Sequence, residues 1–241
     1  DPLMRSDIVE LMEYAKNVLK FKRIYFITNG TRLHLFEKIL EYIDYLYVSL
    51  DSLRVEQYSK RLGVSIKTVD QMIQNTVNFS KLQNKYNFRM SVNIVVDGDS
   101  ISDASEVVDF CVTHNIRFGF NPRRYVEIGS YDHRLKNNIE YINLINRIIK
   151  LKKMGSLVAP SSEYLETVRD FIPFNCNPVL FTPIMPNGDL IYPCSVDGRE
   201  VGNIVELGSC EKAIEQGIKK IGTIKEFKKK SKLCKNECFC V

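Results

Sequence analysis

The amino-acid sequence predicts an α/β protein, namely a partial (β/α) barrel of parallel strands followed by a small C-terminal hairpin-and-helix module rich in cysteine. Short apolar runs alternate with amphipathic stretches as far as about residue 173, which is the order of strands and helices in a parallel sheet. After that point, Pro-Asn-Gly and Asp-Gly turns separate strand-like runs, as in hairpins. Six of the seven cysteines lie in this last part. We therefore expect one domain over residues 1–173 and a second over residues 174–241.

The elements of the first domain follow from hydrophobic periodicity. Apolar residues recur at three- and four-residue steps in six stretches, which predicts helical segments over residues 3–20, 32–43, 54–87, 103–115, 136–154 and 163–172. Short apolar runs that end in polar or turn-forming residues predict strands over residues 24–27, 45–50, 88–96 and 117–120. Four strands at uneven spacing favour part of a β/α barrel or an open doubly wound sheet.

The second domain is predicted from its turns. Strands are expected over residues 180–184, 190–192 and 200–204. Helices are expected near residues 211–220 and 224–230, and they lead the chain to its terminal cysteines.

Composition restricts the class of protein. At 241 residues with 44% hydrophobic and 26% charged residues, the chain can bury a sizeable core. The net charge of +5 sits largely in lysine-rich segments at 150–153 and 225–232, which have few interleaved aromatics, so nucleic-acid binding is not expected. No run approaches the ~20 apolar residues of a membrane span, and no signal peptide is recognisable. We expect a cytoplasmic protein, in which clustered thiols more often hold metal than form disulfides.

Polar residues lie at or near the carboxyl ends of the predicted strands, where parallel β/α proteins bind ligands, and one of them, Asn93, lies within the third strand. They are Thr28, Asn29, Gly30, Ser49, Asp51, Asn93, Asn121, Arg123 and Arg124. Ser49 and Asp51 are two residues apart, so both can face one side and hydrogen-bond a sugar hydroxyl. Alternatively, Asp51 caps a helix that begins near Ser52, and Asn29-Gly30 is a plain turn.

The order of these motifs resembles the radical S-adenosylmethionine (radical SAM) enzymes. Asp1-Pro2 is similar to the second half of the family's glycine-glycine-acid-proline motif. The Thr-Asn-Gly-Thr sequence at 28–31 resembles the turn after the third barrel strand, and the Ser-Leu-Asp sequence at 49–51 resembles the end of the fourth. The resemblance implies that S-adenosylmethionine is the source of a 5′-deoxyadenosyl radical that takes hydrogen from a small-molecule, peptide or protein substrate. It also implies an electron donor such as ferredoxin or flavodoxin.

The resemblance implies a set of cofactor-binding residues. Asp1 and Pro2 are expected near the methionyl amine, with Thr28 and Asn29 in the adjoining turn. Ser49 and Asp51 are expected near the ribose and the methionyl end, and Asn93 at the ribose or the carboxylate. Arg123 or Arg124 can form a two-bond fork with a carboxylate of the cofactor or substrate, or can pair with acids in a surface loop.

The sequence departs from the family in one respect. The motif Cys-x3-Cys-x2-Cys, which binds the cluster that cleaves the cofactor, does not occur in these 241 residues. Since Asp1 falls within the next motif, we expect the missing motif upstream of residue 1. The alternative is a degenerate homologue without radical chemistry.

The cysteine-rich part resembles the SPASM or twitch extension of this family. Gly188-x5-Cys194 and Val201-Gly202-Asn203-Ile204 are similar to recurring SPASM elements. The resemblance implies one auxiliary [4Fe–4S] cluster, with its ligands from Cys176, Cys194 and two or three of Cys234, Cys238 and Cys240. Cys210 is either a further ligand or a plain thiol, and Cys111 fits a hydrophobic core. Tetrahedral zinc is the competing chemistry, and it would make the chain a non-catalytic metal-binding scaffold on a degenerate barrel.

Overall fold

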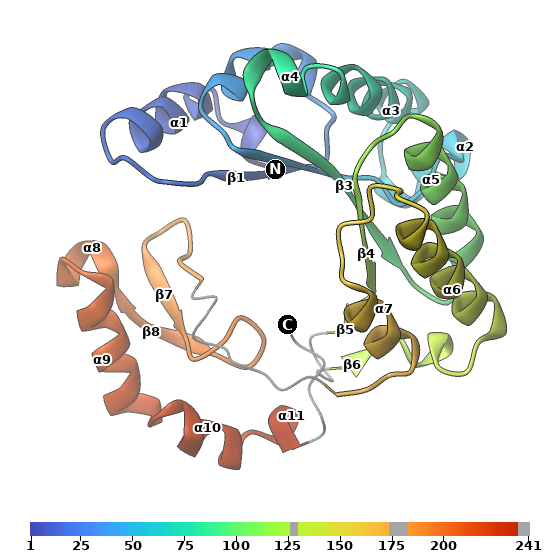
Figure 1. The fold of residues 1–241 in the computed structure, drawn as a ribbon. Helices are drawn as coiled ribbons and strands as arrows, with labels where there is room; N and C mark the ends of the chain where they lie inside the picture. The colour runs from blue at the N-terminus through green and yellow to red at the C-terminus, as the bar shows by residue number, and fades with distance from the viewer. Residues whose placement is uncertain (126–129, 174–182, 236–241) are drawn as a thin grey trace. The chain divides into compact units, whose positions relative to one another are not determined.

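A four-stranded parallel sheet organises the first part of the chain. The computed structural model describes residues 1–125, 130–173 and 183–235. The sheet has the strand order β1 (Tyr25–Thr28), β2 (Tyr45–Ser49), β3 (Arg89–Val96) and β4 (Phe118–Pro122). Every neighbouring pair is parallel, and helical segments connect the strands (Figure 1). The predicted fold class, a partial barrel of parallel strands with a small C-terminal hairpin and helices, is confirmed.

Helices cover one side of this sheet, and α1, α3, α4 and α5 lie on its outer side in Figure 1. The α-helices of this part are α1 (Ile8–Asn17), α2 (Val55–Leu62), α3 (Ile66–Ser80), α4 (Gln83–Tyr86), α5 (Ile101–Thr113), α6 (Ile139–Lys153) and α7 (Ser162–Arg169). Short 3₁₀ helices are η1 (Pro2–Met4), η2 (Leu33–Leu35), η3 (Glu37–Glu41) and η4 (His133–Leu135).

The two faces of the sheet differ in burial because strand side chains alternate between them. The face toward the helices is apolar and buried, and includes Leu46, Val48, Val92, Ile94, Phe118 and Phe120. The opposite face, which we call the inner face, is less buried and includes Tyr25, Ile27, Tyr47, Ser49, Asn93 and Asn121. Polar groups on the inner face are therefore available to a ligand.

The segment between β1 and β2 differs from the sequence prediction. An α-helix was expected over residues 32–43, but the chain forms the two 3₁₀ helices η2 and η3. The buried or partly buried residues Leu33, Phe36 and Ile39 are three residues apart, which matches the three-residue turn of a 3₁₀ helix. Leu35, by contrast, is 60% exposed.

The later part of the chain is built around a hairpin. Strands β7 (Asp189–Tyr192) and β8 (Arg199–Asn203) pair antiparallel, as predicted. Helices α8 (Ile204–Leu207), α9 (Cys210–Ile221), α10 (Ile224–Lys230) and α11 (Lys232–Lys235) follow. The two-residue strands β5 (Arg124–Tyr125) and β6 (Ser130–Tyr131) were not predicted, because two residues carry no periodicity. The strand expected over residues 180–184 falls mostly outside the described residues.

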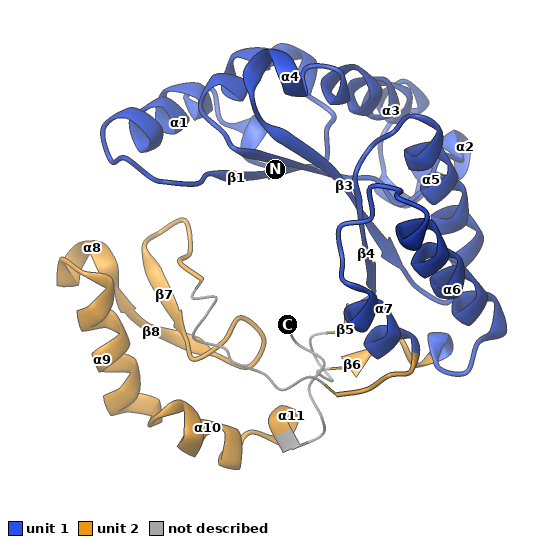
Figure 2. Cartoon of the chain, in the orientation of Figure 1, with its two compact units in different colours: residues 1–123, 134–169 blue, residues 124–133, 170–241 orange. Residues whose placement is uncertain are grey.

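The chain forms two compact units (Figure 2). Unit 1 comprises residues 1–123 and 134–169, and unit 2 comprises residues 124–133 and 170–241. Unit 2 has a core of its own, in which Leu190, Tyr192, Val201 and Ala213 are buried. The predicted assignment of residues 1–173 and 174–241 to two functional domains stays a prediction. Over the described part of the chain, no helix combines the length and the apolar character that a membrane crossing needs.

Candidate cofactor site and cysteine module

The turn after β1 is held by the first residue of the chain. One carboxylate oxygen of Asp1 accepts hydrogen bonds from the Thr28 hydroxyl (2.8 Å) and the Asn29 backbone N–H (2.7 Å). The other oxygen accepts from the Leu3 N–H at 2.9 Å and so caps η1. The structure therefore brings Asp1, Pro2, Thr28 and Asn29 together, and the Asp1 carboxylate positions the turn.

Gly30 completes this turn and cannot be replaced without strain. Its φ of +80° lies in the left-handed region, and a Cβ there would lie 3.0 Å from Cγ1 of Val48. The Asn75 side chain of α3 donates to the Gly30 carbonyl at 2.7 Å and is 1% exposed. Sequence reasoning missed Asn75, because a polar residue within a helix gives no sign of a distant partner.

A row of polar groups crosses the inner face of the sheet. Ser49 and Asn93 are register partners on β2 and β3. Asn121 of β4 donates from its side-chain amide to Oδ1 of Asn93 at 2.8 Å, and the Tyr164 hydroxyl donates to Oδ1 of Asn121 at 2.7 Å. We call Ser49, Asn93, Asn121 and Tyr164 the inner-face polar row. It includes two predicted site residues, together with Tyr164 of α7, which no feature of the sequence singled out.

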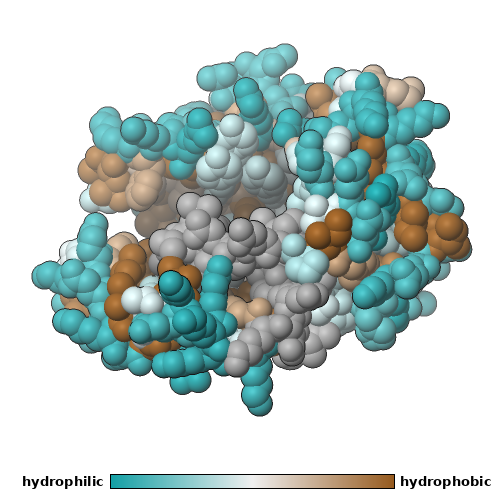
Figure 3. All heavy atoms as spheres, turned by 60° about the horizontal axis from the view of Figure 1, so that its bottom comes forward, coloured by the Kyte–Doolittle hydropathy of each residue, from teal (hydrophilic) through white to brown (hydrophobic). Residues whose placement is uncertain are grey.

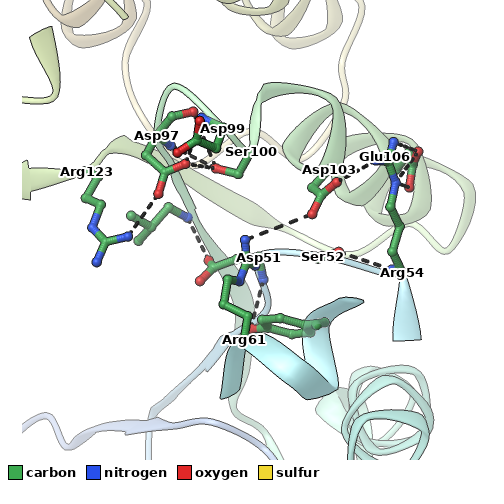
Figure 4. A network of polar contacts seen from close by, with 12 residues as sticks. Asp51, Ser52, Arg54, Arg61, Asp97, Asp99, Ser100, Asp103, Glu106 and Arg123 are labelled. Carbon is green, nitrogen blue, oxygen red and sulfur yellow. Dashed lines mark hydrogen bonds and ion pairs between the residues drawn. The ribbon is translucent and has the colours of Figure 1, made fainter. Parts of the chain in front are cut away.

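Asp51 lies just beyond β2, beside the end of β3 (Figure 4). Its Oδ1 accepts from the Val95 backbone N–H at 2.9 Å. Burial raises the pKa of the Asp51 carboxyl, and the Val95 N–H and the charge of Arg61 offset this only in part. The alternative that Asp51 caps a helix is wrong, because α2 begins at Val55 and no side chain caps it.

Arg123 follows β4 and pairs with an acid. Its Nη1 lies 2.9 Å from Oδ2 of Asp97, and its side chain is 54% exposed. Burial alone would raise the pKa of Asp97, but hydrogen bonds from Ser100 and Arg123 outweigh it and hold that pKa below its usual value. The geometry matches the surface-pairing alternative for Arg123, whereas Arg124 belongs to unit 2.

A charged network supports the loop that carries Asp51 (Figure 4). Arg54 reaches Oε1 of Glu106 at 2.6 Å and Oδ1 of Asp103 at 3.1 Å. The Arg61 guanidinium lies 4.7 Å from the centre of the Tyr58 ring, whose hydroxyl accepts from the Asp51 backbone N–H at 3.3 Å. This network ties the start of α2 to α5 and so fixes the loop after β2.

In unit 2, a chain of hydrogen bonds connects two of the predicted metal ligands. The Sγ of Cys194 accepts from the Asp197 backbone N–H at 3.3 Å. The Asp197 carboxylate accepts from the Ser231 hydroxyl, which accepts in turn from the Cys234 N–H at 3.1 Å. A Cβ on Gly198 would lie 2.1 Å from the Cys194 carbonyl oxygen, so this tight turn requires glycine. We call the contacts of Asp197 and Ser231 the Asp197–Ser231 link.

The remaining cysteines divide into three groups. Cys176, Cys238 and Cys240 lie outside the described residues. Cys210 is exposed at the start of α9. Cys111 is fully buried, and burial raises the pKa of its thiol to about 12, which confirms it as a core residue. Within the residues that the structure describes, no group of three or more potential ligands is gathered around one point.

The side chains of both units have the chemistry that the predicted cofactors need. Hydroxyl, amide and carboxyl groups of the inner-face polar row and Asp51 can pair with ribose hydroxyls, an amine or a carboxylate. Cys194 and Cys234 can supply two of the four thiolates that an iron–sulfur cluster takes.

Comparison with known proteins identifies the family of the sheet-bearing part. The model of the radical SAM superfamily matches residues 1–111, which contain β1, β2, β3 and the turn held by Asp1. Residues 1–111 belong to the radical SAM superfamily. The predicted resemblance to this superfamily of enzymes is confirmed, and its members use S-adenosylmethionine (SAM) and a [4Fe–4S] cluster.

Two curated relatives are similar to this chain. A probable GTP 3′,8-cyclase of Methanococcus aeolicus is 27% identical over 162 residues, covering 66% of this chain and 50% of the relative. The GTP 3′,8-cyclase of Lactiplantibacillus plantarum is 26% identical over 166 residues, covering 66% of this chain and 46% of the relative. The chain thus spans about half the length of these relatives.

A solved structure shares the fold. SuiB of Streptococcus suis superposes with a TM-score of 0.55 at 21% identity, covering 86% of this chain and 51% of SuiB. At this identity the likeness concerns the fold alone. It extends well beyond residues 1–111, because it covers most of the chain.

Proposed function

We propose that this chain carries out radical SAM catalysis, with SAM bound on the inner face of the sheet at the carboxyl ends of β1, β2 and β3. When bound, SAM and a reduced [4Fe–4S] cluster supply a 5′-deoxyadenosyl radical that abstracts hydrogen from a substrate. The observation that carries the proposal is that Ser49 at the end of β2 is the register partner of Asn93 in β3, and that Asp51 bonds the Val95 N–H near the end of β3, all within the family match. In parallel β/α proteins, this edge of the sheet is where ligands bind.

Each side chain has a distinct role in this proposal. The Ser49 hydroxyl and the Asp51 carboxyl pair with ribose hydroxyls, because the two side chains lie two residues apart at the end of one strand. The Asn93 Oδ1 accepts from Asn121, and we assign the Asn93 amide nitrogen to donate to a hydroxyl or carboxylate of the cofactor. Asp1, Thr28 and Asn29 hold the turn that adjoins the methionyl end.

Arg123 stays a predicted contact for the cofactor carboxylate. A carboxylate of SAM would compete for the guanidinium with Asp97, which now lies 2.9 Å away. The cluster that cleaves SAM needs three cysteines in the motif Cys-x3-Cys-x2-Cys, which these 241 residues do not contain. The role that we propose for the chain's own residues is therefore the binding and orientation of SAM.

We also propose an auxiliary [4Fe–4S] cluster in unit 2, held by Cys176, Cys194 and two or three of Cys234, Cys238 and Cys240. Support comes from the Asp197–Ser231 link, which joins the turn of Cys194 to the helix of Cys234. The cluster would bind substrate or accept an electron from the product radical. A donor such as ferredoxin or flavodoxin and a cytoplasmic location complete the proposal.

A peptide or protein is the substrate class we propose, from the resemblance of unit 2 to SPASM modules. A nucleotide is the second candidate, since two relatives at 26–27% identity are named GTP 3′,8-cyclases. Release of 5′-deoxyadenosine that depends on an added peptide, and not on GTP, would support the first class.

The test measures SAM binding by equilibrium dialysis on the product of the full open reading frame. Asn93→Ala and Ser49→Ala should each weaken SAM binding about five- to ten-fold, since each removes a hydrogen bond to a polar ligand worth roughly 1–1.5 kcal/mol. Ser91→Ala is the matched control, because Ser91 lies on the same strand as Asn93, two residues further from the carboxyl end. If all three substitutions weakened SAM binding equally, the proposed position of SAM on the sheet would be contradicted.

Metal analysis after anaerobic reconstitution tests the auxiliary cluster. About four irons and four sulfides per chain, lost in Cys194→Ala, support the [4Fe–4S] cluster. Stoichiometric zinc without sulfide would support the non-catalytic scaffold instead.

A further inference from the structure

Unit 2 contains a cleft whose described lining includes none of the proposed cofactor ligands. It has a volume of about 450 Å³ and lies among α9, α10, α11 and the start of β8. Among the described residues that line it, four are cationic, namely Arg199, Lys220, Lys230 and Lys232. The apolar side chains of Ile221 and Phe227 also line it. We call this feature the basic cleft.

The charge of the basic cleft is strongly unbalanced. Asp197 is the one carboxylate in the described lining, and it already accepts the Ser231 hydroxyl. Lys220 donates to the Val201 carbonyl at 2.8 Å, which anchors one ammonium group against the hairpin. Several cations around one concavity raise the local concentration of anions. The ligand should therefore carry more than one negative charge.

The spacing of the cations indicates an extended ligand. They come from β8, α9, α10 and α11, and all four are exposed. Within the described lining, none of the cationic side chains is buried, whereas a site for a compact anion such as phosphate gathers charged donors at one point. Partly buried Phe227 and Ile221 lie among these cations. On the face that Figure 3 draws, hydrophilic and hydrophobic side chains are likewise mixed. Alternating charge and apolar surface matches a peptide with carboxylates on either side of an apolar residue.

The basic cleft also adjoins the predicted cluster ligands. Asp197 and Ser231, which line it, are the residues of the Asp197–Ser231 link. The Asp197 backbone N–H donates to Cys194 Sγ, and the Ser231 hydroxyl oxygen accepts from the Cys234 N–H. A peptide held in the cleft would thus have its next residues beside Cys194 and Cys234.

We propose that the basic cleft binds an acidic segment of a peptide or protein substrate. Carboxylates of the segment pair with Arg199, Lys230 and Lys232, and an apolar side chain packs against Phe227. The inference deepens the proposed function and rests on it for the identity of the bound peptide as substrate. Peptide binding itself requires neither SAM nor a reduced cluster, so its failure is distinguishable from a failure of SAM binding.

The test uses the whole chain and fluorescence anisotropy of a labelled Glu-Glu-Phe-Glu-Glu peptide. The double variant Lys230→Glu/Lys232→Glu should weaken binding at least about ten-fold, because two attractive charges become repulsive. The matched control is Lys225→Glu/Lys229→Glu, which makes the same charge change on α10 at positions outside the described lining. It should weaken binding less than about three-fold, through general electrostatics alone. A Lys-Lys-Phe-Lys-Lys peptide should not bind.

Three results would overturn the proposal. Equal losses in the two double variants would show that net charge, and not the cleft, attracts the peptide. Displacement of the peptide by inorganic pyrophosphate or GTP, added at the same concentration of negative charge as the peptide, would indicate a small-anion site if Phe227→Ala also binds the peptide as well as wild type does. Tighter binding of an RNA oligonucleotide, also lost in Lys230→Glu/Lys232→Glu, would indicate a nucleic-acid site. Circular dichroism establishes whether each variant is folded. If Lys230→Glu/Lys232→Glu does not fold, Arg199→Glu serves as the second test, and it should also weaken peptide binding.

Discussion

Removing the hydroxyl of Tyr164 should weaken SAM binding although Tyr164 is not a proposed ligand. That hydroxyl donates to Asn121 at 2.7 Å, and Asn121 donates to Asn93 at 2.8 Å. In Tyr164→Phe the ring stays, but Asn121 loses the bond that orients its amide. A hydrogen bond of this kind contributes about 1 kcal/mol. Since about 1 kcal/mol corresponds to a factor of about five in an equilibrium constant, SAM affinity should fall about five-fold.

The assay is equilibrium dialysis of SAM against wild type, Tyr164→Phe, Asn93→Ala and the double variant. If Tyr164 acts through Asn93, the double variant should bind SAM about as well as Asn93→Ala alone, because coupled residues are not additive. Tyr141→Phe is the matched control: it removes a buried hydroxyl that donates to the Val168 carbonyl at 3.1 Å. It should lower the free energy of unfolding by roughly 1–3 kcal/mol while SAM affinity changes less than two-fold.

Two results would refute this reasoning. Unchanged SAM affinity in Tyr164→Phe, with weakened binding in Asn93→Ala, would show that Tyr164 does not position Asn93. Additive losses in the double variant would show that Tyr164 acts on the cofactor by another route.

Further predictions concern the thiols, the first turn and a carboxylate. The buried thiol of Cys111, whose pKa is about 12, should not react with N-ethylmaleimide in the native chain, whereas exposed Cys210 should; mass spectrometry of labelled peptides checks this. Gly30→Ala should destabilise the chain by roughly 1–3 kcal/mol more than Gly155→Ala in urea unfolding, because both have positive φ but only at Gly30 does a Cβ meet a neighbour within 4 Å. The pKa of Asp97 is lowered in the folded state, so the stability that its charge contributes is present above about pH 4 and is lost as pH falls through the folded pKa. Unfolding of wild type and Asp97→Asn at pH 7 and pH 2 should show a smaller stability difference at the lower pH.

The elements that the sequence predicted correctly depend on local periodicity. The strands at 45–50 and 88–96 became β2 and β3 because alternating apolar residues bury one face against the helices. The α-helix expected over residues 32–43 was wrong: the chain forms η2 and η3 there, in which Leu33, Phe36 and Ile39 recur at the three-residue step of a 3₁₀ helix. The grouping of the strand-end motifs was predictable for a different reason, namely that parallel strands bring their carboxyl ends to one edge of the sheet.

The residues that sequence reasoning missed have partners far away in the chain. Tyr164 and Asn121 are separated by 43 positions, Asn75 and Gly30 by 45, and Ser231 and Asp197 by 34. A tyrosine, an asparagine or a serine within or beside a helix is ordinary when its own surroundings alone are considered. Their roles depend on packing between elements, which local patterns do not record.

The sequence by itself determined the alternation of strands and helices, the polar residues at the strand ends and the family resemblance, since each is written in short stretches of chain. Only the tertiary structure decided how those polar residues are engaged. It joined Asp1 to the turn after β1, Asp51 to the end of β3 and Arg123 to Asp97. A hydrogen bond or ion pair has a direction and a length of about 3 Å, and folding alone brings distant groups within that range.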